Sequence, residues 1–330
     1  MKKVVGVIFG GQSREHGVSI VSGTNVADNL DPNKYEVVRI LINLNGSWEI
    51  TNKSWPQIEV EKEYVPKFDK QQSLLNAFEI LRKIDIVFVL LHGPFGEDGT
   101  IQGLLELANV PYTGSGVLAS ALGMDKVASK LLFQSAGIKT PRYVTAHDKE
   151  IPKLPFLPAV VKPVNQGSTV GVSIITSEKQ LKKALEKSAK ISNHHLIEEF
   201  IEGKEVTCAV IGTKTSATAL PIVEVVPKVS GFFDYRAKYA SGGSEEICPA
   251  RLDTALTRKV QEIAVKVFRV LGCSGIARID MIISGEEIFV LELNSIPGLT
   301  PASLVPKELK AAGISFSDFL DQQIEITQKK

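Results

Sequence analysis

The sequence has few cysteines, no long apolar run and almost no net charge, and each deficit excludes a class of protein. Its 330 residues include three cysteines, and none shows the Cys-x-x-Cys or Cys/His spacing of a zinc site or a disulfide framework. The longest clean apolar run, residues 86–91, is far shorter than the roughly 20 residues that span a bilayer. With 38 basic and 37 acidic residues, the net charge of +1 provides no general attraction to nucleic acid or to anionic membranes. We therefore expect a cytoplasmic enzyme that binds neither.

Short apolar runs alternate with amphipathic stretches in the first third of the sequence. The spacing predicts strands at residues 3–10, 35–44 and 85–91 and a helix at residues 19–30. Near-continuous apolar strands separated by helices indicate a parallel sheet covered on both faces, and such sheets bind ligands beyond the carboxyl ends of their strands. Polar residues 10–17 and 92–99 fall at two of those ends. We therefore expect a binding site at that edge.

A change in composition near residue 114 predicts a division of the chain into three segments. These are an N-terminal α/β domain at residues 1–114, a smaller, lysine-rich central subdomain at 115–197 and a C-terminal subdomain at 198–330. The last segment contains a long loop at residues 227–249. After this loop the pattern predicts a helix at 257–271, which Gly272 ends, and strands at 276–283 and 288–293.

The last two predicted strands carry charged residues where a buried hairpin should be apolar. Arg278 and Asp280 are two residues apart and therefore share a strand face, as do Glu292 and Asn294. Burying these groups without partners would cost several kcal/mol. The three oxygen donors suit magnesium, a hard cation that shares its coordination shell with phosphates and water. The alternative is an exposed hairpin face with one Arg–Glu ion pair.

The metal hypothesis has a geometric condition, because Asp280 must face Glu292. A regular two-residue turn would place Asp280 opposite Leu291, whereas a three-residue loop or a bulge would place it opposite Glu292. We therefore expect an odd loop or a bulge around Gly285, with Leu291 pointing into apolar packing. Two carboxylates on opposite faces would refute the site.

Two segments upstream have the composition of nucleotide-binding loops, although each is a weak signal alone. An apolar strand ends at Lys162, and the glycine- and hydroxyl-rich residues 163–171 that follow can bring backbone N–H groups to phosphate oxygens. This loop matches neither the P-loop nor the dinucleotide fingerprint. Further on, Glu198 and Glu205 flank a Gly-Lys turn whose backbone could bind a base edge while a carboxylate binds ribose hydroxyls. A glycine-rich hairpin with a solvated lysine and an acidic hairpin turn are the alternatives.

Taken together, these segments resemble the ATP-grasp ligases and, within them, the D-alanine–D-alanine ligase family. The resemblance covers nearly the whole chain in order. The motifs that carry it are Gly10-Gly11-x-Ser13-x-Glu15, His92-Gly93-Pro94-Phe95-Gly96-Glu97-Asp98-Gly99, Met124-Asp125-Lys126, and residues 162–171, 197–200, 234–239, 277–280, 291–300 and 303–306. The resemblance implies an α/β ATP-grasp architecture, with a doubly wound parallel-sheet domain before an α+β ATP-binding part.

The resemblance also implies an activity, which is the ATP-dependent joining of two D-alanines through an acylphosphate, for peptidoglycan precursor synthesis. It implies ATP, two Mg²⁺ or Mn²⁺ ions and a homodimer. The alternatives are a ligase with another acceptor, D-serine or D-lactate, and a nucleotide-binding module without turnover. Tyr239 favours a dipeptide product over a depsipeptide, because ligases of the family that accept D-lactate tend to differ here.

The resemblance assigns roles to residues at matching positions. For ATP these are Lys126, Lys162 and Lys238 at the phosphates, Glu198 and the backbone of Glu199 and Ile201 at the adenine edge, Phe232 packed on the base, and Glu205 at the ribose. For the metal ions they are Asp280, Glu292 and Asn294. For the first D-alanine they are Glu15, Val18 and His92, and for the second Gly298 and Ser303. Arg278 would stabilise the oxyanion, and Ser168 and Tyr239 would link the closing loops through Glu15.

Overall fold

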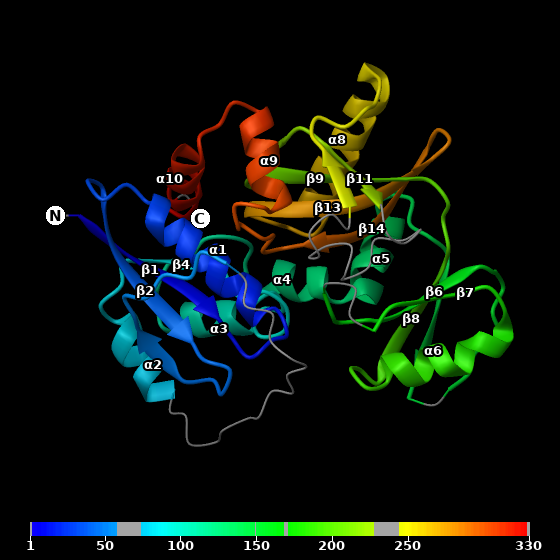
Figure 1. Cartoon of the computed structure of the whole chain (residues 1–330), viewed down its shortest axis with the longest axis horizontal. Coiled ribbons are helices and arrows are strands. Elements are labelled where there is room, and N and C mark those ends of the chain that lie inside the picture. Colours follow the sequence, from blue (N-terminus) through cyan, green and yellow to red (C-terminus); the bar gives the residue numbers. More distant parts are fainter. Residues whose placement is uncertain (1, 58–73, 149, 168–170, 228–243, 329–330) are drawn as a thin grey trace.

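Three β-sheets flanked by helices form the framework of the protein (Figure 1). The computed structural model describes residues 2–57, 74–148, 150–167, 171–227 and 244–328. In these ranges no helix is both long and apolar enough to cross a lipid bilayer.

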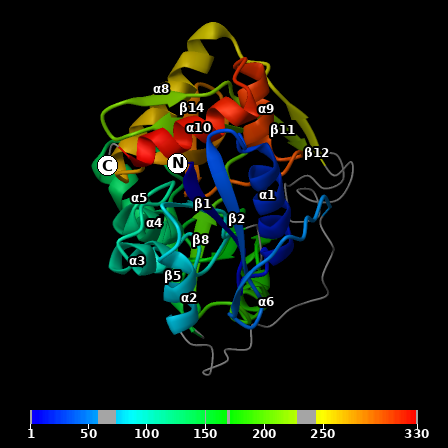
Figure 2. The same cartoon turned by 90° about the vertical axis from the view of Figure 1, so that its left-hand side faces the viewer.

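The first sheet is mostly parallel and has helices on both faces, as the apolar pattern predicts. Its order is β3 (Trp48–Ile50), β2 (Tyr35–Ile42), β1 (Lys3–Gly10) and β4 (Ile86–Val89), and only β3 runs antiparallel to its neighbour. Val7 packs towards α1 (His16–Asn29), whereas Ile8 packs towards α2 (Leu74–Leu81) and α3 (Thr100–Leu107). Figure 2 shows α1 on one side of the sheet and α2 and α3 on the other.

The turn after β1 requires glycine. Gly10 and Gly11 have φ values of 91° and 90°, which L side chains rarely adopt. A Cβ on Gly10 would also lie 2.4 Å from the carbonyl oxygen of Ile42. This turn leads to Glu15, which immediately precedes α1 and therefore lies beyond the carboxyl end of the central strand.

The second sheet is antiparallel throughout. Its order is β5 (Tyr143–His147), β8 (His194–Glu199), β6 (Ala159–Pro163) and β7 (Ser173–Ile175). The short η1 (Glu178–Gln180) leads into α6 (Leu181–Ser188), whose Leu181 and Leu185 cover Val161 and Ile197. The two strands predicted on either side of the loop after Lys162 are confirmed by β6 and β7.

The third sheet is also antiparallel and carries the hairpin near the end of the chain. Its strands are β9 (Lys204–Gly212), β10 (Ala217–Ala219), β11 (Val223–Pro227), β12 (Ser244–Ile247), β13 (Gly275–Ser284) and β14 (Glu287–Asn294), in the order β12-β11-β9-β13-β14 with β10 paired to β9. The segment predicted as a loop at 227–249 therefore ends in a strand, β12, which pairs with β11.

Helices cover both faces of the third sheet. The core under one face contains residues of α4 (Val117–Met124), α5 (Lys126–Ser135) and α8 (Thr254–Val270). On the other face, α9 (Leu304–Ala311) and α10 (Phe316–Thr327) share a core with the first sheet, where Val305 and Phe319 lie in one cluster with Val5. α8 begins three residues before its predicted start because the Asp253 side chain caps it, accepting a hydrogen bond from Leu256 N at 2.8 Å.

These cores do not follow the predicted division of the chain throughout. α4 and α5 fall in the segment predicted as the central subdomain, but Ala119 and Phe133 are buried with Ile279 of β13. The apolar faces of these helices thus belong with the third sheet. The boundary near residue 114 itself stays a prediction.

Candidate active site

The charged hairpin forms, and one of its faces lines a cleft. In β13 and β14, Asp280 lies opposite Glu292 and Arg278 lies opposite Asn294. The alternate residue Ile279 is fully buried in the core under α8. The period of two along a strand therefore places the charged side chains on one face, as predicted.

A β-bulge sets this register, although not at the predicted position. The two-residue turn at Gly285 is regular, and the register shifts between Asp280 and Met281. Leu291 is the extra residue, and it lines the cleft beside Glu292 instead of packing into the core. The predicted place of the bulge and the predicted direction of Leu291 are wrong, whereas the facing of the two carboxylates is confirmed.

Three side chains hold Asp280 in place. Arg278 donates to it from Nε and Nη2, each at 2.9 Å, Thr207 donates from Oγ1 at 2.6 Å, and Asn294 donates from Nδ2 at 3.0 Å. The Arg278 and Asp280 side chains are 13% and 12% exposed. Because a bidentate pair fixes both partners, the guanidinium group has a defined position at the edge of the cleft.

The oxygen donors of the hairpin fit magnesium. Asn294 donates to Asp280 through its amide nitrogen, and its amide oxygen is the atom that could bind an ion. Within the part of the chain that the structure describes, no group of three or more His, Cys, Asp and Glu side chains could hold a metal ion. Two carboxylates and an amide suit an ion that completes its shell with phosphate oxygens and water, which is how magnesium binds in nucleotide sites.

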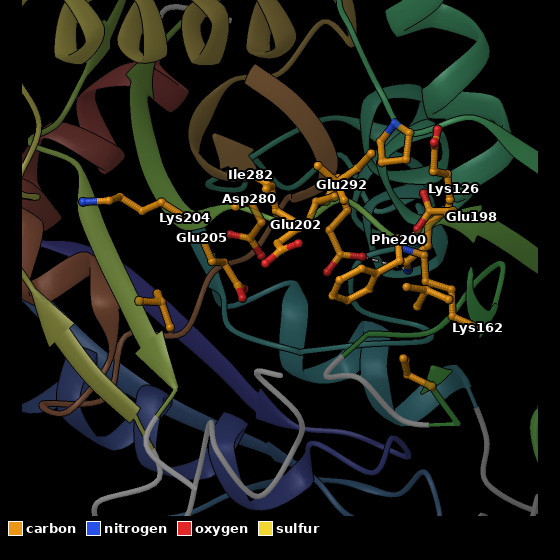
Figure 3. A pocket seen from close by; sticks show the side chains of 18 of the residues that line it. Lys126, Lys162, Glu198, Phe200, Glu202, Lys204, Glu205, Asp280, Ile282 and Glu292 are labelled. Carbon is orange, nitrogen blue, oxygen red and sulfur yellow. Dashed lines mark ion pairs between the residues drawn. The ribbon is translucent and has the colours of Figure 1, made fainter. Parts of the chain in front are cut away.

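A cavity of about 600 Å³ lies between the second and third sheets, beside the hairpin (Figure 3). Val160, Ile282 and Leu291 contribute apolar wall to it. Lys126 lies 3.2 Å from Glu292 Oε2 through its Nζ, which also donates to the carbonyl oxygen of Gln166 at 2.6 Å. The cavity thus combines an apolar slot with cations beside the two facing carboxylates, a combination suited to a nucleotide.

Glu198, which lines the same cavity, is buried between two lysines. Its carboxylate pairs with Lys162 of β6 and with Lys130 of α5, whose side chain is 0% exposed. Burial lowers the pKa of Lys130 to about 8, against the opposing pull of Glu198. Burial also acts to lower the pKa of Lys162, but the charges of Glu198 and Glu292 outweigh it and the pKa is raised. The same lysines overcome burial at Glu198 and lower its pKa, so Glu198 and Lys162 are charged at neutral pH and Lys130 is mostly protonated there.

A second, smaller cavity of about 200 Å³ adjoins the first. Glu205, Val225 and Asp280 line both cavities. Its far wall brings together residues that follow β1 and β4 of the first sheet and residues that follow β14, namely Glu15, Val18, His92, Glu97, Ile296, Pro297, Gly298, Thr300 and Ser303. A group bound beside Asp280 would therefore be within reach of molecules in both cavities.

Glu15 lies where two loops approach each other in this wall. A Cβ on Gly93 or on Gly167 would come within 3.1 Å of Glu15 Oε2. Gly167 belongs to the loop after Lys162, and Gly93 to the segment after β4. A side chain at either position would therefore require the Glu15 carboxylate to shift by a few tenths of an ångström.

His92 and Glu97 are buried beside Glu15. Burial lowers the pKa of His92, so its ring is neutral. Burial, followed by the charge of Glu15, raises the pKa of Glu97 to about 7. The two side chains also bind the backbone of Ile296, His92 through Nδ1 at 2.9 Å and Glu97 through Oε1 at 3.1 Å.

The structure brings the described members of the predicted site together in these two cavities. The larger cavity contains Lys126, Lys162, Glu198, Glu199, Ile201, Glu205, Asp280 and Glu292, and the smaller contains Glu15, Val18, His92, Arg278, Asn294, Gly298 and Ser303. Ser168, Phe232, Lys238 and Tyr239 lie outside the described residues.

Sequence reasoning assigned no role to three residues of this region. Lys130 lies one helical turn after Lys126, and that i, i+4 spacing was the available signal. Glu97 lies within the motif at residues 92–99, and its place in that motif was the available signal. Thr207 has no local signal, because only the pairing of β9 with β13 brings it opposite Asp280.

Comparisons with known proteins cover the whole length of the chain. The family models described as "D-ala D-ala ligase N-terminus" and "D-ala D-ala ligase C-terminus" match residues 4–115 and 118–325. A relative named D-alanine–D-alanine ligase, from Syntrophobacter fumaroxidans, is 42% identical over 98% of this chain and 97% of its own length.

Solved structures give the same result. A D-alanine–D-alanine ligase from Bacillus anthracis complexed with ATP is 32% identical with a TM-score of 0.79, and the match covers 99% of this chain and 98% of that one. A D-Ala:D-Ser ligase from Enterococcus faecalis is 34% identical with a TM-score of 0.82, covering 99% and 100%.

Proposed function

This chain belongs to the D-alanine–D-alanine ligase family, and we propose that its two adjoining cavities join two D-alanines at the expense of ATP. The observation that carries the proposal is the position of Asp280 and Arg278 at the boundary of the cavities. A phosphoryl group delivered there from the larger cavity meets an amino acid held in the smaller one. The product serves peptidoglycan precursor synthesis and, through it, the cell wall.

ATP binds in the larger cavity in this proposal. The base lies in the apolar slot against the backbone of Glu199 and Ile201, with Glu205 at the ribose. Lys126 and Lys162 face the phosphates. Asp280, Glu292 and Asn294 would hold the magnesium ions, which neutralise charge on the phosphate oxygens and orient the transferred group.

The first step forms an acylphosphate. Glu15 holds the ammonium group of the first D-alanine, whose carboxylate oxygen attacks the γ-phosphorus while ADP leaves. Both reactants are anionic, so the cations around the boundary lower the barrier. We also assign to Lys238, Phe232, Ser168 and Tyr239 the roles that the resemblance implies, in phosphate binding, base packing and loop closure.

The second step makes the peptide bond. The second D-alanine is held near Gly298 and Ser303, and its amine, after losing a proton, attacks the acyl carbon. The tetrahedral oxyanion that develops is stabilised by Arg278 and by the Gly298 N–H, and its collapse expels phosphate. The bidentate pair with Asp280 supports this role because it fixes the guanidinium group.

The experiment that tests the proposal measures phosphate release from ATP with a panel of D- and L-amino acids and identifies the products. We expect release with D-alanine, with D-alanyl-D-alanine formed in equal amount, and none with L-alanine. Preferred formation of D-alanyl-D-serine would identify D-serine as the second substrate. We include D-serine because the chain is similar to the D-Ala:D-Ser ligase from E. faecalis. A flat response to every amino acid would leave only nucleotide binding.

We also propose that the enzyme is a homodimer in the cytoplasm. The location follows from its use of ATP and from its three free cysteines. The dimer surface we favour is the region where α3 contacts α4, because Leu107 of α3 and Leu118 of α4 are 84% and 72% exposed. Leu118→Asp should therefore shift the sedimentation coefficient to that of a monomer, whereas Ile151→Asp, at an exposed apolar residue elsewhere, should not. A dimer that survives Leu118→Asp would move the interface elsewhere.

A further inference from the structure

The segment between β14 and α9, residues 295–303, has no regular secondary structure and yet forms part of the smaller cavity. We refer to it as the acceptor loop. A buried irregular segment must find partners for its backbone N–H and C=O groups outside a helix or sheet ladder. Where those partners come from decides what holds the loop in place.

Side chains of the first domain supply them on both sides of Gly298. The N–H of Ile296 donates to Glu97 Oε1 at 3.1 Å, and its carbonyl accepts from His92 Nδ1 at 2.9 Å. The N–H of Leu299 donates to Ser22 Oγ at 3.2 Å, and its carbonyl accepts from Asn25 Nδ2 at 2.7 Å. The residues that flank Pro297 and Gly298 are thus each bound through both of their backbone polar groups.

Glu97 is the member of this group that an amide side chain cannot replace. Its Oε1 accepts from Ile296 N, and its Oε2 accepts from Gly93 N at 2.9 Å. The carboxylate therefore ties the acceptor loop to the segment after β4, where it is 9% exposed. A glutamine has one acceptor oxygen and an NH₂ group that only donates, so it can satisfy only one of these two N–H groups.

The tautomer of His92 follows from the same contacts. The carbonyl of Ile296 can only accept, so Nδ1 carries the proton and Nε2 is an acceptor. Ser22 lies 3.3 Å from Nε2 and can donate its hydroxyl proton there while it accepts from Leu299 N. His92 is therefore engaged at both nitrogens in holding the loop.

We propose that Glu97 is a positioning residue for the second step, which holds the Ile296 N–H so that the Gly298 N–H points at the developing oxyanion. The inference deepens the proposed function and rests on it. The position of Gly298 follows from its neighbours, because Ile296 and Leu299 are each held through both backbone polar groups. Displacing Ile296 therefore moves the oxyanion donor relative to Arg278, which is fixed separately by Asp280. Losing this alignment should slow peptide formation and leave phosphoryl transfer intact.

The test compares Glu97→Gln with the unmodified enzyme and with Glu106→Gln as a matched control. The Glu106 carboxylate accepts a hydrogen bond from the Tyr112 hydroxyl and does not line either cavity. Steady-state kinetics give KM for ATP and kcat/KM for the acceptor D-alanine. Exchange of ¹⁸O between bridging and non-bridging positions of ATP, with D-alanine present, reports the first step separately. We expect Glu97→Gln to lower kcat/KM for the acceptor at least tenfold. The KM for ATP should stay within about twofold of its value in the unmodified enzyme, and the rate of isotope exchange should stay within about twofold or increase.

Two results would overturn the inference while the unmodified enzyme still makes dipeptide. One is an equal loss of isotope exchange and peptide formation in Glu97→Gln, and the other is no change in either. If Glu97→Gln does not fold, Ser22→Ala tests the same loop from the side of Leu299 and should show the same selective loss on a smaller scale. Failure of the unmodified chain to make any dipeptide would overturn the proposed function, and this inference with it.

Discussion

At the scale of single residues, Lys162 shares its buried partner with Lys130, a residue that does not line the nucleotide cavity. Glu198 is shared by Lys130 and Lys162, and Lys130 also binds the hydroxyl of Thr140. Removing one cation from a buried carboxylate leaves part of the negative charge uncompensated. The carboxylate then depends more strongly on its remaining cation. Lys130 therefore bears on how Lys162 meets a phosphate.

We predict that Lys130→Met weakens ATP binding. With Lys130 gone, Glu198 would pair with Lys162 alone and compete with the phosphates for it, so KM for ATP should rise about fivefold or more while KM for D-alanine changes little. Lys130→Arg keeps the charge and should lose less. Lys139→Met removes an exposed lysine that pairs with Glu287 and serves as the control. A change confined to D-alanine kinetics would contradict the prediction.

A second residue-scale prediction concerns Arg278. Arg278→Ala should lower kcat more than tenfold with little loss of ATP affinity, because Thr207 and Asn294 still hold Asp280 when the guanidinium group is removed. Removing a single oxyanion donor typically costs 10²–10³ in kcat in other enzymes. Nucleotide binding measured by calorimetry beside turnover gives the comparison, and a parallel loss of both would argue against a role confined to the oxyanion.

At the scale of elements, strand β11 carries a buried carboxylate whose partners set its titration. Glu224 accepts from Arg251 N and Nε at 3.1 Å and from Nη2 at 2.7 Å, and it lies 3.1 Å from Lys204 Nζ. These contacts, those of Arg251 above all, lower its pKa from the usual 4.5 to about 2 against the opposing effect of burial. The folded protein therefore binds this proton less readily than the unfolded chain does.

The lowered pKa of Glu224 determines how its contribution to the stability of the folded protein changes with pH. The contribution of Glu224 to stability is fully present above pH 4.5 and is lost as the pH falls towards about 2. It amounts to at most about 3.5 kcal/mol, at about 1.4 kcal/mol for each tenfold change in proton affinity. Glu224→Gln should therefore lower Tm at pH 7, and the difference from the unmodified protein should narrow towards pH 3. Glu262→Gln, at an exposed pair with Arg258, should show no such trend. A Tm difference between Glu224→Gln and the unmodified protein that does not change with pH would contradict the prediction.

The elements also show what the sequence could and could not predict. The period of two placed Arg278 and Asp280 on one face, because strand geometry alternates side chains whatever the surroundings. The position of the bulge did not follow from the sequence, because it depends on how the strands pair and not on local turn chemistry. Likewise, the burial of Lys130 depends on β8 bringing Glu198 to α5, a contact between segments more than sixty residues apart. The members of the candidate site could be named from motifs, whereas the contacts that hold them could not.

At the scale of the whole molecule, every sheet contributes to the two cavities. The second sheet supplies Lys162 and Glu198, the third supplies Asp280 and Glu292, and Glu15 comes from the segment after β1 of the first. The acceptor loop is bound by the first domain although it follows a strand of the third sheet. Ligands that occupy the cavities should therefore stabilise the arrangement of the sheets as well as their own contacts.

This arrangement predicts how magnesium and nucleotide act on stability. A ligand that binds only the folded state adds about 2.7 kcal/mol at a concentration one hundred times its Kd. A non-hydrolysable ATP analogue with Mg²⁺ should raise Tm by several degrees, because its phosphates and the ion would bridge Lys162 of the second sheet and Glu292 of the third. EDTA should remove most of that increase. In Glu292→Gln the increase should no longer depend on Mg²⁺, whereas Glu287→Gln, on the same strand but paired with the exposed Lys139, should behave as the unmodified protein does. An unaltered response to EDTA in Glu292→Gln would remove this carboxylate from the metal site, and the bulge at Leu291 would then need another explanation.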